Sequence, residues 1–324
     1  MDPGATVLPI SSHCHTNGIR LRVLSWPANA ASLPFLLLHG LASNARFWEP
    51  VAARLVTAGH AVYAPDLRGH GQSDAPGGGY DFETVTQDLA GLVSALGLRR
   101  FVVAGHSWGG HVALDFVPHH HPAGLGLIDG GFTQLNDSPQ ATWEKVEQAL
   151  TPPRLAGTAQ THFLERLSTA HPFWPADVPW KEIVMANFEV HPDGTIAPHL
   201  AFENHMRVVR AMWEFPTYER FRQVRCPVLI AAARPSGATA RRDEAFLELK
   251  RRGQEQAMAN LARLRFVWMD DTDHDIPLHR PGPLADLLLV DGNPLENIKL
   301  IEDPAKNFVV IMKDGKIHKN LAPR

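Results

Sequence analysis

The sequence predicts an α/β protein with a mostly parallel β-sheet flanked by helices, and two observations support this prediction. Short segments with the length and apolar content of strands recur along the chain, at residues 19–25, 34–38, 61–64, 101–104, 124–128, 227–232 and 265–269. Segments with the apolar spacing of helices lie between several of them. Apolar strands that alternate with helices form right-handed βαβ units, which build a parallel sheet.

The predicted helices follow the strands in a regular order. Residues 45–58 carry apolar side chains at helical spacing between the second and third strands. Residues 82–98 carry a longer apolar stripe and have Gly97 near their end, which is typical of a helix stop. A further helix-forming segment, 111–116, follows the strand at 101–104. We therefore expect helices on both faces of the sheet.

The alternation stops after Gly131, and residues 133–222 contain no clear strand. Aromatic residues are frequent in this segment, which holds four of the eight tryptophans: Trp143, Trp174, Trp180 and Trp213. The strand pattern resumes near Pro227. We interpret the segment as a helical cap that is inserted into the sheet domain and covers one end of it.

Composition limits the classes of function. The chain has 324 residues with 31 Lys and Arg against 34 Asp and Glu, a net charge of −3, so neither a nucleic-acid partner nor an anionic membrane is expected. Cys14 and Cys226 are the only cysteines, which excludes a disulfide scaffold or a Cys-rich zinc module. No apolar run approaches 18 residues, and residues 1–4 do not resemble a signal peptide. We expect a cytoplasmic protein.

The strongest motif for function is Gly-His-Ser-Trp-Gly at residues 105–109, directly after an apolar strand and before a helix-forming segment. A sharp strand-to-helix turn would hold Ser107 in a strained conformation and lift its hydroxyl above the sheet. Glycines at both flanks avoid Cβ clashes in such a tight turn. The backbone N–H of Trp108 would then face the reacting oxygen and stabilise its negative charge.

A second motif follows the apolar strand 34–38, where the chain continues with His39, Gly40 and Leu41. The loop after this strand can supply the other N–H group of an oxyanion hole, and we assign it to Leu41. Residues 66–74, Asp-Leu-Arg-Gly-His-Gly-Gln-Ser-Asp, follow the next strand. We interpret this segment as a structural loop that Arg–Asp pairs hold in place.

These motifs resemble those of the α/β-hydrolase superfamily over roughly residues 15–282. The resemblance rests on the His-Gly pair at 39–40, the loop at 66–74, the Ser107 turn and His274-Asp-Ile-Pro at 274–277. It implies a serine nucleophile, a carboxylic acid and a histidine base, which occur in that order along the chain. It implies no metal and no organic cofactor.

The resemblance assigns the general base to His274, which lies in the loop after the last core strand. The acid has two candidate positions. In most of these enzymes it follows the strand at 227–232, but this chain has Ser236 near the expected position, so the candidates there are Asp243 or Glu244. Some members place the acid after the strand that follows the nucleophile helix, and Asp129 occupies that position. We favour Asp129 and retain Asp243 as the alternative.

The expected activity is that of a carboxylesterase or lactonase that forms an acyl-enzyme on Ser107. The expected substrate is a small ester or lactone with an apolar acyl or aryl part, in a pocket lined by His39, Trp108, Trp143, Trp174, Trp180 and Trp213. Dehalogenases and epoxide hydrolases of this fold need an aspartate nucleophile, which position 107 does not provide. Hydrolysis of amide or C–C bonds by the same triad, or a non-catalytic ligand-binding role, are the alternatives.

The C-terminal segment resembles a different family. Residues 283–296 and 309–316 are similar to the C-terminus of metal-dependent amidohydrolases of the imidazolonepropionase type, without their barrel and metal ligands. We expect strands at 286–291, 308–313 and 316–318, although 282–289 could instead form the last hydrolase helix. A chimera joined within 282–290 would explain the change. The predicted organisation is core at 1–132, cap at 133–222, core at 223–282 and tail at 283–324.

Overall fold

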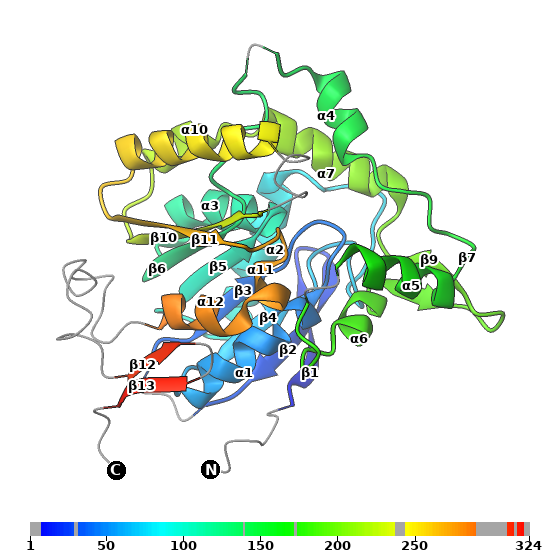
Figure 1. Ribbon diagram of the computed structural model, residues 1–324, viewed down its shortest axis with the longest axis horizontal. Helices are drawn as coiled ribbons and strands as arrows, with labels where there is room; N and C mark the ends of the chain where they lie inside the picture. Colours follow the sequence, from blue (N-terminus) through cyan, green and yellow to red (C-terminus); the bar gives the residue numbers. More distant parts are fainter. Residues whose placement is uncertain are drawn as a thin grey trace.

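The computed structural model shows a central β-sheet between two layers of helices (Figure 1). It describes residues 8–28, 32–138, 140–171, 174–236, 244–289, 310–313 and 316–320. The sheet has eight strands in the order β1-β2-β4-β3-β5-β6-β10-β11. Their bounds are β1 Ile10–Thr16, β2 Ile19–Trp26, β3 Phe35–Leu38, β4 Val62–Pro65, β5 Val102–His106, β6 Gly124–Ile128, β10 Val228–Arg234 and β11 Leu264–Asp270.

The strand pairing confirms the predicted mostly parallel sheet. The six strands from β4 to β11 in the sheet order are parallel to one another, whereas β2 pairs in antiparallel fashion with β4 and with the edge strand β1. All seven predicted core strands are present, with ends that differ by a residue or two. Strand β1 was not predicted from the sequence, because most of its residues are polar and exposed and therefore give no apolar pattern.

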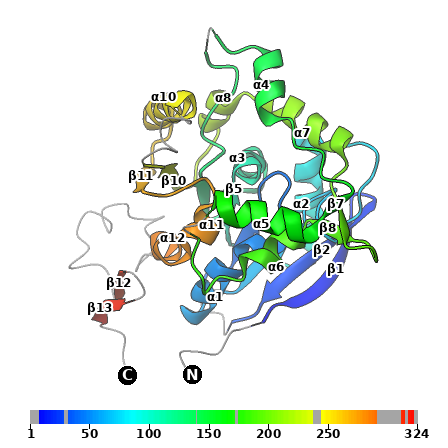
Figure 2. The same cartoon turned by 45° about the vertical axis from the view of Figure 1, so that its right-hand side comes forward.

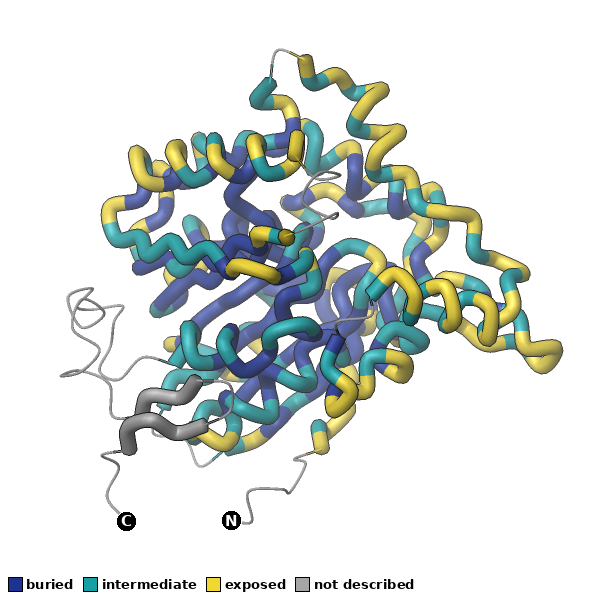
Figure 3. The backbone as a smooth tube through the Cα atoms, in the orientation of Figure 1, coloured by how far each residue is buried: buried dark blue, intermediate teal, exposed yellow. Residues whose placement is uncertain are grey.

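Helices cover both faces of the sheet, and alternate strand residues enter two separate cores. Val103 and Leu125 pack with α2 and α3, while Val102 and Ala104 pack with α1 and α12 on the opposite face. The most deeply buried backbone follows the sheet (Figure 3). The helices of these layers are α1 Glu49–Thr57, α2 Phe82–Ala95, α3 Trp108–His120, α10 Glu244–Asn260 and α12 Pro281–Leu288, with a short 3-10 helix, η1 Ala45–Trp48, before α1.

The segment between β6 and β10 contains the predicted helices, but the expectation that it has no strand is wrong. Its helices are α4 Trp143–Leu150, α5 Gln160–Ala170, α6 Trp180–Met185, α7 Phe202–Glu214 and α8 Thr217–Phe221. Three short strands, β7 Thr158–Ala159, β8 Phe188–Val190 and β9 Thr195–Pro198, form a small antiparallel sheet beside α5 (Figure 2). Strands of two to four residues are too short to give a recognisable alternation in the sequence.

Side-chain contacts attach this segment to the sheet domain. The Asn44 amide, before η1, donates to the backbone carbonyl of Ile183 at 2.9 Å and to the Asn187 side chain at 2.7 Å. At another point the Asn204 amide of α7 donates to the Tyr80 hydroxyl at 3.0 Å. The segment is therefore fixed to the core through buried polar contacts as well as apolar packing.

The prediction of a strand at 286–291 is wrong for its first residues, which lie in α12. Leu284 and Ala285 are buried against α1, so the segment completes the helical layer of the core. The remainder of that predicted strand, from residue 290, lies outside the described residues. Further on, β12 Val310–Lys313 and β13 Lys316–Asn320 pair in antiparallel fashion, as expected for a hairpin.

Charged groups hold the loop at 66–74 in place, as its composition suggested. The Arg68 guanidinium donates two hydrogen bonds to the Asp88 carboxylate of α2, at 2.8 and 2.7 Å, and both side chains are buried. The Asp66 carboxylate accepts the N–H of Ala45 at 2.7 Å and pairs with Arg22 at 3.2 Å. Since each charge is paired and hydrogen-bonded, the loop remains ordered next to the Ser107 turn.

Replacing Asp88 by Ala should lower the free energy of unfolding by about 3–5 kcal/mol, because the buried Arg68 cation would lose its partner. Urea unfolding measures the change. Glu248→Ala is the matched control, since the Arg251–Glu248 pair is exposed and such pairs contribute about 0.5 kcal/mol. Equal losses in the two variants would contradict the structural role of the Arg68–Asp88 pair.

Candidate active site

Ser107 occupies the sharp turn between β5 and α3. Its backbone has φ 53° and ψ −121°, a strained conformation for a residue with a Cβ atom. A Cβ at Gly105 would collide with the backbone of Gly109, and one at Gly130 would collide with the backbone of Ser107. Glycine at these positions lets the chain turn directly at the carboxyl end of the sheet and expose the hydroxyl.

Asp129 and His274 are in direct contact although 145 residues separate them. His274 Nδ1 lies 2.7 Å from Asp129 Oδ2, so the ring donates its N–H to the carboxylate. Asp129 follows β6, the strand next to β5, and its side chain is fully buried. The His274 side chain keeps 46% of its surface exposed, which leaves its other ring nitrogen available for a substrate.

The charges around this pair shift the pKa of both groups. Burial raises the pKa of Asp129, but the hydrogen bond from His274 and the positive charge of Lys250 lower it by more, so the carboxyl is ionised. Burial lowers the pKa of His274, and the hydrogen bond and charge of Asp129 raise it by more. The pKa of His274 is therefore above its usual value, because the negative charge of Asp129 stabilises the protonated ring.

His274 lies beside the Ser107 turn. His106 Nε2, on the residue before Ser107, is 2.9 Å from the backbone carbonyl of His274, and the two rings have centroids 4.7 Å apart. No hydrogen bond joins the Ser107 hydroxyl to His274 among those of the described residues. The Ser107–His274 contact therefore stays a prediction, which rests on this proximity.

The two backbone N–H groups that were predicted to form the oxyanion hole belong to Leu41, in the loop after β3, and to Trp108, the residue after Ser107. Neither the N–H of Leu41 nor that of Trp108 has a hydrogen-bond acceptor among the described residues. A Cβ placed on Gly40 would lie 3.1 Å from the Ser107 Cβ, so the loop after β3 passes close to the nucleophile turn. An oxyanion hole requires such unoccupied donors near the nucleophile, so the assignment to Leu41 and Trp108 stays a prediction.

The structure does not support His39 as a pocket-lining residue. It is fully buried, with Nδ1 2.8 Å from the Gly40 carbonyl and Nε2 accepting the Leu67 N–H at 2.9 Å. Burial lowers the pKa of His39 to about 4, so the ring is neutral. His39 therefore shapes the loop that presents the Leu41 N–H. Trp108 is also buried, and its ring stacks on His70 with centroids 5.3 Å apart.

The four cap tryptophans form two separate pairs rather than one wall. Trp143 and Trp213 lie between α4 and α7 with ring centroids 6.4 Å apart. Trp174 and Trp180 pack edge to face at 5.4 Å, and Trp174 Nε1 donates to Asp273 Oδ2, in the loop of His274, at 3.0 Å. The contribution of Trp143 and Trp213 to a pocket shared with Trp174 and Trp180 stays a prediction.

Asp273, which the sequence analysis missed, joins the cap to the loop of His274. Its carboxylate lies 3.3 Å from His171 Nδ1 and 3.2 Å from His279 Nδ1, in addition to its bond with Trp174. Burial raises the pKa of Asp273, but these hydrogen bonds lower it by more, so the pKa lies below its usual range. The sequence signal was an additional acidic residue directly before the predicted base.

Lys250 of α10 is the second residue that the sequence analysis missed. Its side chain is buried, and its ammonium group lies 2.8 Å from Asp129 Oδ1 and 2.9 Å from Asp129 Oδ2. The alternative acid, Asp243, lies outside the described residues, and Glu244 is exposed at the start of α10. Lys250 belongs to no recognisable sequence motif, so it could not be identified from the sequence.

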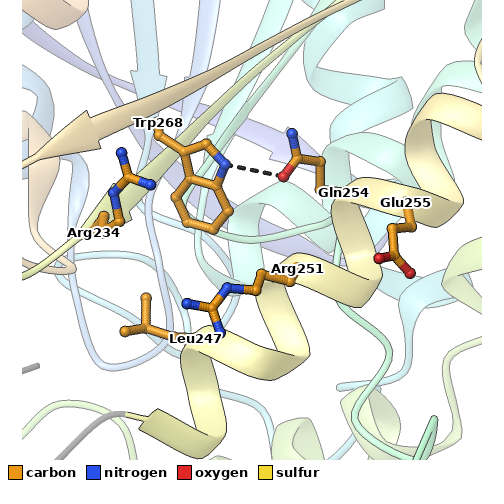
Figure 4. A pocket seen from close by; sticks show the side chains of 6 residues that line it. All are labelled: Arg234, Leu247, Arg251, Gln254, Glu255 and Trp268. Carbon is orange, nitrogen blue, oxygen red and sulfur yellow. Dashed lines mark hydrogen bonds between the residues drawn. The ribbon is translucent and has the colours of Figure 1, made fainter. Parts of the chain in front are cut away.

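A groove elsewhere on the surface contains none of these groups. It lies between β11 and α10 and is lined by Arg234, Leu247, Arg251, Gln254, Glu255 and Trp268 (Figure 4). Trp268 Nε1 donates to Gln254 across it at 3.0 Å.

In the parts of the chain that the structure describes, no helix is long and apolar enough to cross a bilayer. Those parts also contain no cluster of His, Cys, Asp and Glu side chains placed to hold a metal ion.

A serine at a strained strand-to-helix turn, beside a His–Asp pair at the carboxyl edge of a parallel sheet, defines the α/β-hydrolase class. The profile of the alpha/beta hydrolase family matches residues 35–287. The chain belongs to this family. The match ends within α12, so the resemblance of the tail to amidohydrolases and its chimeric origin remain hypotheses.

Known relatives differ in their reactions. Epoxide hydrolase A of Mycobacterium tuberculosis is 41% identical over 97 residues, which are 29% of this chain and 30% of that protein. The non-heme chloroperoxidase of Streptomyces lividans is 39% identical over 90 residues, 28% of this chain and 33% of that protein. Such matches span about a quarter to a third of the length of the curated relatives.

Among solved structures, an esterase from Exiguobacterium antarcticum has a TM-score of 0.63 at 18% identity, over 86% of this chain and 98% of that one. Similarity at this level shows the fold alone.

Replacing Asp273 by Asn should lower the free energy of unfolding at pH 7 by about 2 kcal/mol, because an amide binds the donors of His171, His279 and Trp174 less strongly than a carboxylate does. The lowered pKa makes this contribution complete above about pH 4, and it is lost as the pH falls through the native-state pKa. Urea unfolding of both proteins at pH 7 and pH 3 should show a difference that narrows at pH 3. A difference that stays constant or widens on acidification would contradict the role of Asp273.

Proposed function

We propose that the protein is a serine hydrolase that cleaves carboxylic esters or lactones through Ser107, His274 and Asp129. The observation that carries the proposal is the 2.7 Å hydrogen bond between His274 Nδ1 and Asp129, at the end of the sheet where Ser107 occupies its strained turn. This bond fixes the tautomer that leaves Nε2 of His274 unprotonated, which is the form that a general base needs.

The reaction would proceed in two steps. His274 Nε2 takes the proton of the Ser107 hydroxyl while its oxygen attacks the acyl carbon, and the N–H groups of Leu41 and Trp108 bind the resulting oxyanion. The imidazolium then gives its proton to the leaving alkoxide, which departs as the alcohol. In the second step His274 takes a proton from water, the hydroxide attacks the acyl-enzyme, and Ser107 regains its proton as the acid leaves.

Asp129 is the favoured acid for two reasons. Its carboxylate touches His274, and the N–H of Ala233 holds its Oδ1 at 2.7 Å, so the negative charge is fixed in position. Glu244 is exposed at the start of α10 and accepts no hydrogen bond from His274 among the described residues. We propose that Asp129 stabilises the imidazolium form of His274 during both steps.

The proposed substrate is a small ester or lactone whose apolar acyl or aryl part lies toward the cap. The pair of Trp174 and Trp180, connected through Asp273 to the His274 loop, supports an apolar surface on this side of the site. The esterase among the similar folds is consistent with ester chemistry. The epoxide hydrolase relative does not extend its reaction to this chain, because Ser107 stands where the aspartate nucleophile of such enzymes would be needed.

Ser107→Ala should reduce the hydrolysis of a short-chain p-nitrophenyl ester to background, because no nucleophile remains. Asp129→Asn should reduce kcat by about 10⁴-fold, by analogy with the serine-protease triad, because the histidine would lose its tautomer and its counter-charge. Steady-state kinetics on esters, lactones and anilides of the same acyl group measure both effects and separate ester from amide hydrolysis.

Asp243→Asn is the matched control and should retain activity. A large loss in Asp243→Asn with none in Asp129→Asn would assign the acid to residue 243 instead. Equal turnover by wild type and Ser107→Ala, or no turnover of any acyl substrate by the wild type, would refute the hydrolase proposal and favour a ligand-binding role.

A further inference from the structure

The carboxylate that orients His274 is also bound by a lysine. Lys250 Nζ lies 2.8 Å from Asp129 Oδ1, 2.9 Å from Asp129 Oδ2 and 2.9 Å from the carbonyl oxygen of Ala233. The side chain of Asp129 is fully buried and that of Lys250 is 5% exposed. An ammonium group with this little contact to water needs such a complete set of partners.

Asp129 Oδ2 therefore accepts two hydrogen bonds, one from the lysine and one from the His274 ring. Lys250, Asp129 and His274 form a continuous chain of ionisable groups that begins on α10 and ends at the exposed imidazole. The lysine reaches the site beside β10, whose residues Ala231, Ala232 and Ala233 are small and buried. The acid of most hydrolases of this fold follows the strand that corresponds to β10, so Lys250 reaches Asp129 from the side of that alternative position.

We propose that Lys250 is a positioning residue for the Asp129–His274 pair. Its ammonium group keeps the Asp129 carboxylate ionised and aimed at His274. Its positive charge also weakens the stabilisation of the protonated imidazole by that carboxylate. The inference rests on the function proposed above. A neutral His274 is the form that can accept the Ser107 proton.

Electrostatics give the direction of the effect. Asp129 and Asp275 raise the pKa of His274, whereas burial and the charge of Lys250 lower it. The other ionisable groups near the imidazole are His106 from β5, whose ring centroid is 4.7 Å away, and Asp273, which is adjacent in sequence. Burial lowers the pKa of His106 to about 3, so it contributes no charge near neutral pH. Among the described groups, Lys250 is thus a cation that opposes the effect of Asp129 and Asp275 on His274.

Lys250→Met should raise the pKa of His274 by about one unit, the size expected for removal of one nearby charge at a partly buried site. The acidic limb of kcat/KM should move to higher pH by the same amount. Activity well below the wild-type pKa should then fall about tenfold, while activity above the shifted pKa should change much less. The titration of His274 is followed by NMR of ¹⁵N-labelled imidazole, with its signal assigned by its absence in His274→Ala.

Arg251→Met is the matched control, because Arg251 is the next residue on α10 and is exposed, with a side chain paired to Glu248. Its NMR titration and pH profile should equal those of the wild type. Lys250→Gln keeps a donor for the Ala233 carbonyl while it removes the charge, and serves as the second variant if Lys250→Met does not fold.

A folded Lys250 variant whose His274 titrates at the wild-type pH would overturn the inference, even if the variant is less stable. The NMR measurement needs no turnover, so the two proposals can fail separately. A shifted His274 titration in a protein without Ser107-dependent hydrolysis would refute the proposed function alone. Ser107-dependent hydrolysis with an unshifted titration would refute the role of Lys250 alone.

Discussion

The close approach of three backbone segments at Ser107 is the constraint on which the rest of the site depends. The turn after β5, the loop after β3 and the residues after β6 meet there, and a side chain at Gly105, Gly109 or Gly130 would collide with neighbouring backbone. This approach brings the loop that carries Leu41 close to the strained Ser107 backbone. The parallel order of β3, β5 and β6 makes it possible, because the carboxyl ends of adjacent parallel strands share one edge of the sheet.

The buried carboxylates near this edge of the sheet are charged, and they are bound by cations or by hydrogen-bond donors. Asp129 is bound by His274, Lys250 and the Ala233 N–H, and Asp273 by cap and loop side chains. Buried ions are stable only when such partners are present. As a result, the exposed imidazole of His274 is supported from the core through Asp129 and from the cap through the loop that carries Asp273. The same arrangement connects the position of the cap to that of the proposed base.

Much of the fold could be predicted because it depends on patterns that are local in sequence. Apolar runs identified the core strands, and the Gly-His-Ser-Trp-Gly turn identified the position of Ser107. The sequence could not reveal β1, whose residues are polar at an exposed edge, or the two- to four-residue strands of the cap. Lys250 and Asp273 were missed for a different reason: most of their partners are far away in the chain, and a single charged residue in a helix or loop carries no periodicity.

The central claim is that Ser107 is a nucleophile activated by His274. Treatment with a fluorophosphonate, followed by digestion and mass spectrometry, tests it most directly, because such reagents form a stable bond only with an activated serine. The account predicts one adduct, on the peptide that contains Ser107, and greatly slowed labelling in His274→Ala. Labelling at another serine, or equal labelling rates with and without His274, would contradict it.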